Sequence, residues 1–213
     1  MSEKPVLYHY PLSPNAVKVL SVLHHLGLDY DEVIVDLPRG GSHTPEFLAL
    51  NPNGKIPVLK EGDFILPESN AIIRYLAEKT GSDLIPADLR QRALMDSWLH
   101  WQGAHWTPAY GHMTFERLAP RLIPGYAVDE AAQARAQALI DRFAPVLDRH
   151  LEGRRWVLGE QLSLADFSLA STLVHRALAG ISLEAYPNIA AWVQRVEELP
   201  AYRRAMPQMP TPA

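Results

Sequence analysis

The chain has 213 residues, of which 47% are apolar and 21% charged, and its formal net charge at pH 7 is −4. These proportions are typical of a folded globular protein and exclude disordered, collagen-like and coiled-coil chains. Neither half has the basic excess of a nucleic-acid-binding protein, and no apolar run is long enough to span a membrane. Residues 1–14 lack the apolar stretch of a signal peptide, so we expect a cytoplasmic protein. There is no cysteine, so any reacting thiol must belong to a ligand.

The first part of the chain alternates strand and helix patterns. Val6–Tyr10 is rich in β-forming residues and predicts a strand, and Asn15–Leu26 has apolar residues at helical spacing before a glycine. Tyr30–Asp36 predicts a second strand, so these segments have the size of a parallel βαβ unit, about 30 residues. A hairpin and a helix follow, at Pro57–Lys60, Asp63–Leu66 and Glu68–Glu78. The order β-α-β, β-β-α predicts a thioredoxin-like α/β domain over residues 1–80.

The rest of the chain is helical in pattern. Thr80–Ala87 is expected to be a linker, and no convincing strand pattern follows it, which predicts an all-α helical domain over residues 88–213. Ser163 and Asp166 have the spacing of a capping box in which Asp replaces the usual Glu or Gln, so we expect them to begin a buried helix and to be structural. The other expected helices are Leu89–Phe115, Asp129–His150 and Asn188–Leu199, and Ala205–Ala213 is expected to be a loose tail.

Four short motifs carry a resemblance: Leu12–Asn15 (LSPN), Asn51–Leu59 (NPNGKIPVL), Glu68–Ile72 (ESNAI) and Ser163–Asp166 (SLAD). In this order, at these separations and with a helical second half, the chain resembles the glutathione S-transferases over essentially its whole length. The resemblance implies a cytosolic homodimeric enzyme of detoxification that activates the thiol of glutathione for attack on an apolar small-molecule electrophile. It implies glutathione as co-substrate, no cofactor, no metal, and neither a nucleic-acid nor a membrane partner.

Two other functions fit the same motifs. The triplet Ser-Pro-Asn at Ser13 is similar to the Thr-Pro-Asn of the nu-type bacterial enzymes, which reduce disulfides with glutathione. This similarity keeps open a glutathione-dependent disulfide or peroxide reductase. The other alternative is a non-catalytic, transferase-like binding module. The intact Ile56–Pro57 and Glu68–Ser69 pairs argue against such a module, because a chain that no longer binds glutathione need not keep them.

Ser13 and Asn15 are the catalytic candidates. Ser13 fits a helix N-cap, with Pro14 at the first helical position. The resemblance implies instead that its hydroxyl donates to the sulfur of glutathione, as the matching serine does in theta-, phi- and zeta-type relatives. A thiol has a reference pKa of ~8.5, and a hydroxyl donor and a helix N-terminus both favour the thiolate. The Asn15 amide could also reach the sulfur or simply occupy the first turn, and Tyr8 and Tyr10 are rival hydroxyls.

The resemblance also assigns residues to the cysteinyl and glycyl parts of glutathione. Ile56–Pro57 matches the family's cis-proline site, where the outward-facing backbone N–H and C=O of Ile56 would pair with the cysteinyl part like an added strand. Lys55 could pair with a glutathione carboxylate, or be a solvated loop lysine. His43 lies near the position where relatives place a residue that contacts the glycine carboxylate, in a loop made mobile by glycines.

Glu68 and Ser69 are the candidates for the γ-glutamyl end of glutathione. Acidic and hydroxyl residues are common in the first turn of a helix for structural reasons alone. In the resemblance, the Ser69 hydroxyl and its N–H bind the γ-glutamyl carboxylate at a helix N-terminus, while Glu68 pairs with the α-ammonium. An acid beside an anion site makes sense here because this end of the ligand is zwitterionic.

An aromatic stretch in the expected helix Leu89–Phe115 is the candidate for the electrophile pocket. Most of it is expected to be core. Relatives line the pocket with this helix, however, and Pro108 should break its regularity nearby, so the resemblance favours Trp106, Tyr110 and Phe115 as electrophile contacts. The histidines of this stretch lack the paired spacing of a zinc site, which agrees with an enzyme that needs no metal.

Overall fold

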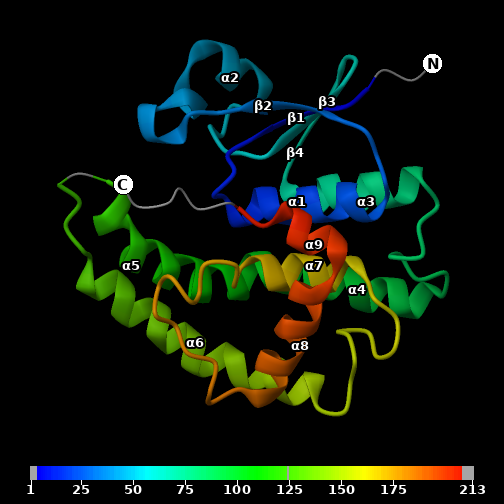
Figure 1. Cartoon of the computed structure of the whole chain (residues 1–213), viewed down its shortest axis with the longest axis vertical. Coiled ribbons are helices and arrows are strands. Elements are labelled where there is room, and N and C mark those ends of the chain that lie inside the picture. The colour runs from blue at the N-terminus through cyan, green and yellow to red at the C-terminus, as the bar shows by residue number, and fades with distance from the viewer. Residues whose placement is uncertain (1–3, 124, 208–213) are drawn as a thin grey trace. The chain divides into compact units, whose positions relative to one another are not determined.

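Figure 1 shows a computed structural model of the chain, which describes residues 4–123 and 125–207. The described residues form two compact units, the first containing residues 4–82 and 200–207 and the second residues 83–199 apart from 124. The border falls inside the expected linker Thr80–Ala87. The sequence predicts a helical domain over 88–213, whereas residues 200–207 group with the first unit, and the rest of the expected tail Ala205–Ala213 lies outside the described residues. In the first unit the helix α9 (Pro200–Ala205) packs against α1 (Pro14–His25).

The first unit is built on a sheet with the strand order β2-β1-β3-β4. β2 is parallel to β1, whereas β3 is antiparallel to both β1 and β4. A parallel pair joined by a helix and followed by a hairpin is the arrangement that the sequence predicts, and the thioredoxin-like fold is confirmed. The strands are β1 (Val6–His9), β2 (Asp31–Ile34), β3 (Val58–Glu61) and β4 (Phe64–Pro67).

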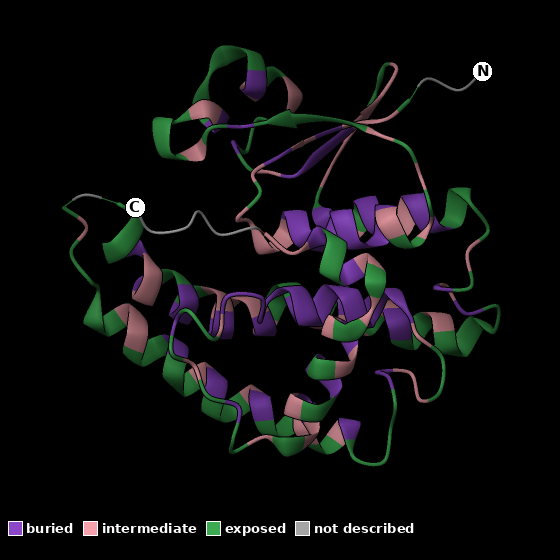
Figure 2. Cartoon of the chain, in the orientation of Figure 1, coloured by how far each residue is buried: buried purple, intermediate pink, exposed green. Residues whose placement is uncertain are grey.

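Helices cover both faces of this sheet (Figure 1). α1 and α3 (Ser69–Lys79) pack together on one face, and α2 (Pro45–Leu50) lies on the other. Tyr8 and Val58 pack with Phe47 of α2, so the alternating neighbours of these strand residues point toward α1 and α3. The middle of α1 is buried without interruption from Ala16 to Leu23 (Figure 2), and both α3 and α9 pack against this helix.

The sequence did not predict α2. Its six residues are too few to show a helical period of apolar side chains, and only its beginning carries a helix signal. Pro45 occupies the first turn, and the Thr44 hydroxyl accepts a hydrogen bond from Phe47 N at 3.3 Å. α2 matters for the site because it closes the long connection that leads from β2 back to β3.

The second unit is helical, as predicted. Its described elements are α4 (Leu89–Trp101), the π-helix η3 (Gln102–Gly111), α5 (His112–Leu122), α6 (Glu130–Leu151), α7 (Leu164–Ser171) and α8 (Pro187–Glu198). The expected helix Leu89–Phe115 is therefore α4, η3 and the start of α5. Pro108 lies inside η3, and a proline that cannot donate to the preceding turn accounts for the local change in hydrogen bonding. In the part of the chain that the structure describes, no helix combines the length and the apolar character needed to cross a membrane.

The capping box at the start of α7 is present and has further partners. Asp166 is fully buried and accepts hydrogen bonds from Ser163 N at 2.9 Å and from Ser163 Oγ at 3.0 Å. It also accepts from Val157 N at 2.8 Å and from the indole Nε1 of Trp192 at 2.9 Å. Burial raises the pKa of Asp166, while these donors act in the opposite direction. Asp166 therefore joins three segments of the helical unit.

Candidate active site

The strand register gathers the predicted glutathione residues at one end of the sheet. Tyr8 of β1 pairs with Val58 of β3, which pairs with Pro67 of β4. Since β1 runs antiparallel to β3 and β3 to β4, the segment after β1, the segment before β3 and the segment after β4 meet at the same end. These segments carry Ser13, Ile56–Pro57 and Glu68–Ser69. The connection from β2 to α2, which carries His43, leaves from this end too, because β2 is parallel to β1.

Ser13 occupies the N-cap position of α1, but its side chain makes no capping hydrogen bond. The turn is held by the main chain instead, because Ser13 O accepts from Ala16 N at 2.9 Å and from Val17 N at 3.0 Å. Pro14 supplies the first helical residue, whose fixed φ favours the helix without help from a side chain. The half-buried Ser13 hydroxyl is therefore not used by the first turn of α1.

Asn15 and Ser69 join the first turns of α1 and α3. Ser69 Oγ donates to Asn15 Oδ1 at 3.3 Å, and it accepts from the ammonium of Lys18 at 3.0 Å. Lys18 Nζ also donates to Asn70 Oδ1 at 2.9 Å. The sequence places Asn15 and Ser69 in the site but gives no indication of Lys18, which lies in the middle of an apolar helix pattern. Burial lowers the pKa of Lys18 to about 7, against the opposing charge of Glu68.

Glu68 has a left-handed backbone directly before α3. Its φ is 71°, and among the described residues no other residue except glycine has a positive φ. Non-glycine residues adopt this conformation at a cost, and such residues gather at functional sites. The Glu68 carbonyl accepts from Ile72 N at 2.9 Å, so the main chain already belongs to the helix, while the side chain remains exposed.

Asn51 organises the loop that carries Lys55. Asn51 is buried, donates from Nδ2 to Lys55 O at 2.6 Å and accepts from Asn53 N at 3.1 Å. The bond between Ile56 and Pro57 that follows is cis, as the resemblance implies. Asn51 is thus a supporting residue that the sequence marks only as part of the NPNG motif.

His43 lies beside this loop. Its Nδ1 is 3.1 Å from the hydroxyl of the buried Ser42, and a Cβ atom added to Gly54 would lie 3.2 Å from its Nε2. A serine hydroxyl that donates to Nδ1 would leave the hydrogen on Nε2, which then could donate to a carboxylate. Ser42 and Gly54 therefore hold the His43 ring against the turn before Lys55.

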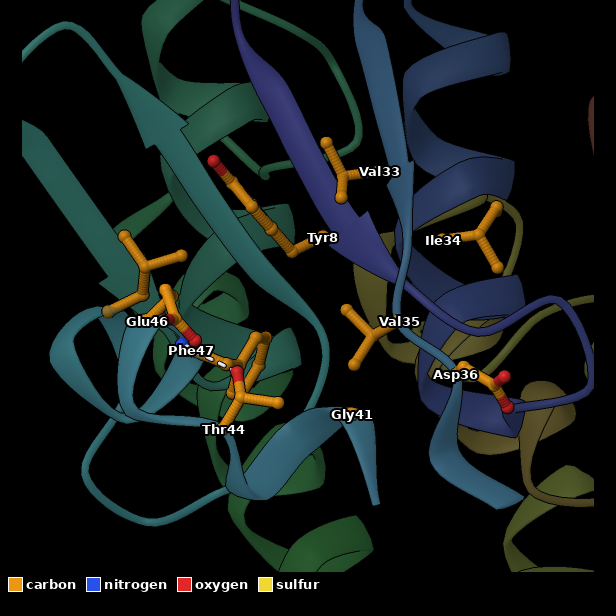
Figure 3. A pocket seen from close by; sticks show the side chains of 10 residues that line it. Tyr8, Val33, Ile34, Val35, Asp36, Gly41, Thr44, Glu46 and Phe47 are labelled. Carbon is orange, nitrogen blue, oxygen red and sulfur yellow. Dashed lines mark hydrogen bonds between the residues drawn. The ribbon is translucent and has the colours of Figure 1, made fainter. Parts of the chain in front are cut away.

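The Tyr8 side chain lies on the α2 face of the sheet. It lines a cleft of about 400 Å³ between the sheet and α2, next to Val33, Val35, Phe47 and Thr44 (Figure 3). The rings of Tyr8 and Phe47 meet edge to face at 6.5 Å. None of the residues predicted for glutathione lines this cleft, although Ile56 packs against the same apolar cluster as Tyr8. The contact with Phe47 of α2 places the Tyr8 side chain on the face of the sheet opposite α1 and α3. Tyr10 follows β1 and is half-buried.

The electrophile candidates lie in the second unit, where two of them contact each other. The rings of Trp106 and Tyr110 are 4.4 Å apart, both residues are buried, and the Trp106 indole donates to Leu169 O at 3.1 Å. The buried Tyr110 hydroxyl has no hydrogen-bond partner among the described residues, and burial raises its pKa. Phe115 is 51% exposed and packs edge to face on Tyr126 at 5.6 Å.

Comparison with protein families matches both units. The glutathione S-transferase N-terminal domain matches residues 7–83, and the glutathione S-transferase C-terminal domain matches residues 106–200. Glutathione S-transferase 3 of Zea mays is 35% identical over 212 residues, which cover 97% of this chain and 95% of that protein. The disulfide-bond oxidoreductase YfcG of Escherichia coli (strain K12) is 36% identical over 208 residues, which cover 94% and 93%.

The solved structures agree with these sequence relatives. A glutathione transferase from Burkholderia graminis, solved with two glutathione molecules bound per protein subunit, superposes with a TM-score of 0.83 at 32% identity. The superposition covers 96% of this chain and 88% of that one. The similarity therefore extends over the α/β unit and the helical unit alike.

Proposed function

This chain belongs to the glutathione S-transferase family and is a glutathione transferase, and we propose that Ser13 activates the glutathione thiol for attack on an apolar electrophile. One observation carries the choice of Ser13. Its hydroxyl sits at the N-terminus of α1 without capping the helix. A hydroxyl that the fold does not use is available to a ligand, and this one lies at the end of the sheet where the other glutathione motifs meet.

The proposed chemistry is ionisation followed by nucleophilic attack. The thiol loses its proton to water, and the Ser13 hydroxyl donates a hydrogen bond to the resulting thiolate sulfur. The positive end of the α1 dipole favours the same ionised form. The sulfur then forms a bond to the electrophilic carbon, and the leaving group departs with the electron pair of the broken bond. Ser13 lowers the pKa of the thiol without itself exchanging a proton.

The other glutathione contacts follow from the segments that meet at this end. Ser69 and the N–H groups of the first turn of α3 bind the γ-glutamyl carboxylate, and Glu68 pairs with the ammonium beside it. The backbone of Ile56, before the cis bond to Pro57, pairs with the cysteinyl residue in the manner of an added strand. Lys55 and His43 serve the glycine carboxylate. Asn51 fixes the main chain at Lys55, and Ser42 contacts the ring of His43.

The electrophile side of the proposal is apolar. Of the three aromatic candidates, the exposed Phe115 would provide aromatic surface, whereas Trp106 and Tyr110 are fully buried and would support that surface from the interior of the helical unit. We propose a cytoplasmic homodimer acting in detoxification as the biological setting. A glutathione titration by calorimetry, followed by a rate screen of aryl halides, disulfides and peroxides, tests the activity. Turnover of aryl halides that falls strongly in Ser13→Ala supports the proposal, whereas unchanged turnover in that variant contradicts it.

Disulfide reduction is the second candidate function, and because the chain has no cysteine, glutathione must supply every thiol of the reaction. A glutathione thiolate would attack a disulfide sulfur, release one thiolate product and remain joined to the other half as a mixed disulfide. Because the chain has no cysteine, a second glutathione must attack this intermediate, which yields glutathione disulfide and the second thiol. Similarity to a disulfide-bond oxidoreductase and to a transferase that binds two glutathione molecules favours this alternative. A stoichiometry of two glutathione molecules per chain would support it.

A further inference from the structure

Lys18 is a buried cation beneath the first turn of α3. The residue is 1% exposed and lies on the side of α1 that packs against α3. Its ammonium donates to Ser69 Oγ at 3.0 Å and to Asn70 Oδ1 at 2.9 Å. These two oxygens are neutral and belong to the first turn of α3. A lysine is rarely buried so completely, and burying its charge is unfavourable, so its position calls for a physical reason.

The ammonium determines which way the Ser69 hydroxyl donates. Protonated Lys18 has hydrogens to give and no lone pair, so in this form Ser69 Oγ must be the acceptor in the contact, and a bound carboxylate favours the protonated form. The hydroxyl hydrogen is then directed away from Lys18, and it donates to Asn15 Oδ1 at 3.3 Å. Lys18 thereby leaves the Ser69 hydroxyl free to donate its hydrogen to an acceptor on the side away from Lys18.

The electrostatics of this corner favour an anion. The buried ammonium and the N-terminal end of the α3 dipole are both positive and lie close together. The exposed carboxylate of Glu68 acts on Lys18 and partly offsets this charge. A carboxylate bound at the first turn of α3 would lie beside the Lys18 ammonium and the N-terminus of α3. Because the ammonium is already buried, its attraction to a bound carboxylate is weakly screened by water.

We propose that Lys18 is the positioning residue for the γ-glutamyl carboxylate of glutathione, orienting the Ser69 hydroxyl toward it and supplying positive charge behind that hydroxyl. This role rests on the proposed function, since the carboxylate belongs to the glutathione assigned above. When the carboxylate binds, the Ser69 hydrogen moves from Asn15 Oδ1 to the ligand. Lys18 acts through Ser69 and through its charge, so it is not itself a catalytic residue.

The test compares two ligands on two proteins. One ligand is glutathione, and the other is 4-aminobutanoyl-cysteinyl-glycine, which keeps the ammonium, the thiol and the glycine carboxylate but lacks the γ-glutamyl carboxylate. Calorimetry should find that Lys18→Met weakens glutathione binding roughly tenfold to hundredfold, as expected for a hydrogen-bonded charge. The same substitution should change affinity for the analogue less than about twofold, because the group that senses Lys18 is absent. Lys4→Met, which removes an exposed lysine paired with Asp31, should alter neither affinity.

The outcomes separate this inference from the function on which it rests. Wild-type protein that binds no glutathione overturns the proposed function. If the wild type binds glutathione, two results overturn the role of Lys18 alone. In one, Lys18→Met weakens the affinity for both ligands by the same factor, and in the other it leaves the affinity for glutathione unchanged. Lys18→Gln provides the comparison if the methionine variant does not fold. The chemical shift of the Lys18 ¹³Cε resonance provides a comparison in the wild type, without any substitution. This chemical shift should change when glutathione binds and should not change when the analogue binds.

Discussion

Ser69 Oγ lies 3.3 Å from Asn15 Oδ1, so the first turn of α3 contacts the first turn of α1 across 54 residues of sequence. One turn carries the residue proposed for the γ-glutamyl carboxylate, and the other begins at the residue proposed for the thiol. The two ends of the glutathione site are thus connected by a side-chain hydrogen bond. Substitutions at either end must therefore be tested for effects on both binding and ionisation.

Ser13→Ala should raise the pKa of the thiol of enzyme-bound glutathione by about one unit or more, each unit being ~1.36 kcal/mol. Affinity for glutathione should change little, because the hydroxyl favours only the ionised thiol. Stability should change by well under the ~1 kcal/mol of a lost cap, since the Ser13 side chain makes no capping bond. Ultraviolet absorbance of the thiolate against pH measures the first effect, and thermal unfolding measures the last.

Asn15→Ala is the matched comparison for this titration. If only Asn15→Ala moves the curve, the catalytic role belongs to Asn15 and disulfide reduction becomes the favoured activity. If neither variant moves it, Ser13 is not the activating group, and the half-buried Tyr10 becomes the next hydroxyl to examine.

The double variant Glu68→Gln, Ser69→Ala should weaken glutathione binding at least tenfold, because hydrogen bonds to charged groups contribute roughly 1.5–3 kcal/mol each. Calorimetry provides the measurement, and Ser97→Ala, an exposed serine of α4, provides a control that should bind normally. Unchanged affinity in the double variant would remove the whole assignment of the γ-glutamyl site.

Asp166→Ala should lower the free energy of unfolding by about 3 kcal/mol or more, because each buried donor left without an acceptor costs roughly 1–3 kcal/mol. The substitution leaves Val157 N, Ser163 N and Trp192 Nε1 without their buried acceptor. Urea unfolding measures the loss, and the folded fraction should keep its affinity for glutathione. A variant with full stability and selectively lost affinity would show that Asp166 acts in the site and not in the fold.

The parts predicted from sequence are those fixed by local pattern. Alternation and turn residues indicate the strands around Tyr8 and Val58, and a four-residue motif indicates the box at Asp166. The motif does not reveal that Trp192 also donates to Asp166, because that contact forms between helices. The π-helix is predicted only in part: Pro108 indicates that the helix becomes irregular there, but it does not indicate π-helical hydrogen bonding.

The candidate site divides in the same way. Ser13, Asn15 and Ser69 are predicted because they belong to motifs. Lys18 is missed because its neighbours in sequence are apolar, and its partners Ser69 and Asn70 lie more than 50 residues away. Only the packing of α1 against α3 makes a lysine at this position a buried group aimed at the site.

The titration of Lys18 predicts how the stability of the glutathione-free protein depends on pH. Its pKa is lowered by burial from 10.5 to about 7 in the folded state. Between these two values the unfolded chain holds the proton that the folded chain releases, so the contribution of Lys18 to stability increases as pH rises. Below about pH 6 both states are protonated, and the contribution is constant at its least favourable value.

The difference in unfolding free energy between wild type and Lys18→Met isolates this contribution, because the other titrating groups are present in both proteins. Urea unfolding from about pH 6 to about pH 10 should show the wild type gaining a few kcal/mol relative to the variant, at ~1.36 kcal/mol per unit of pH above the folded pKa. Lys4→Met is the control, and its difference from wild type should show no such gain, since Lys4 is exposed and its pKa is raised by Asp31. A flat difference for Lys18→Met would mean that Lys18 keeps its proton throughout, as a lysine with an ordinary pKa does.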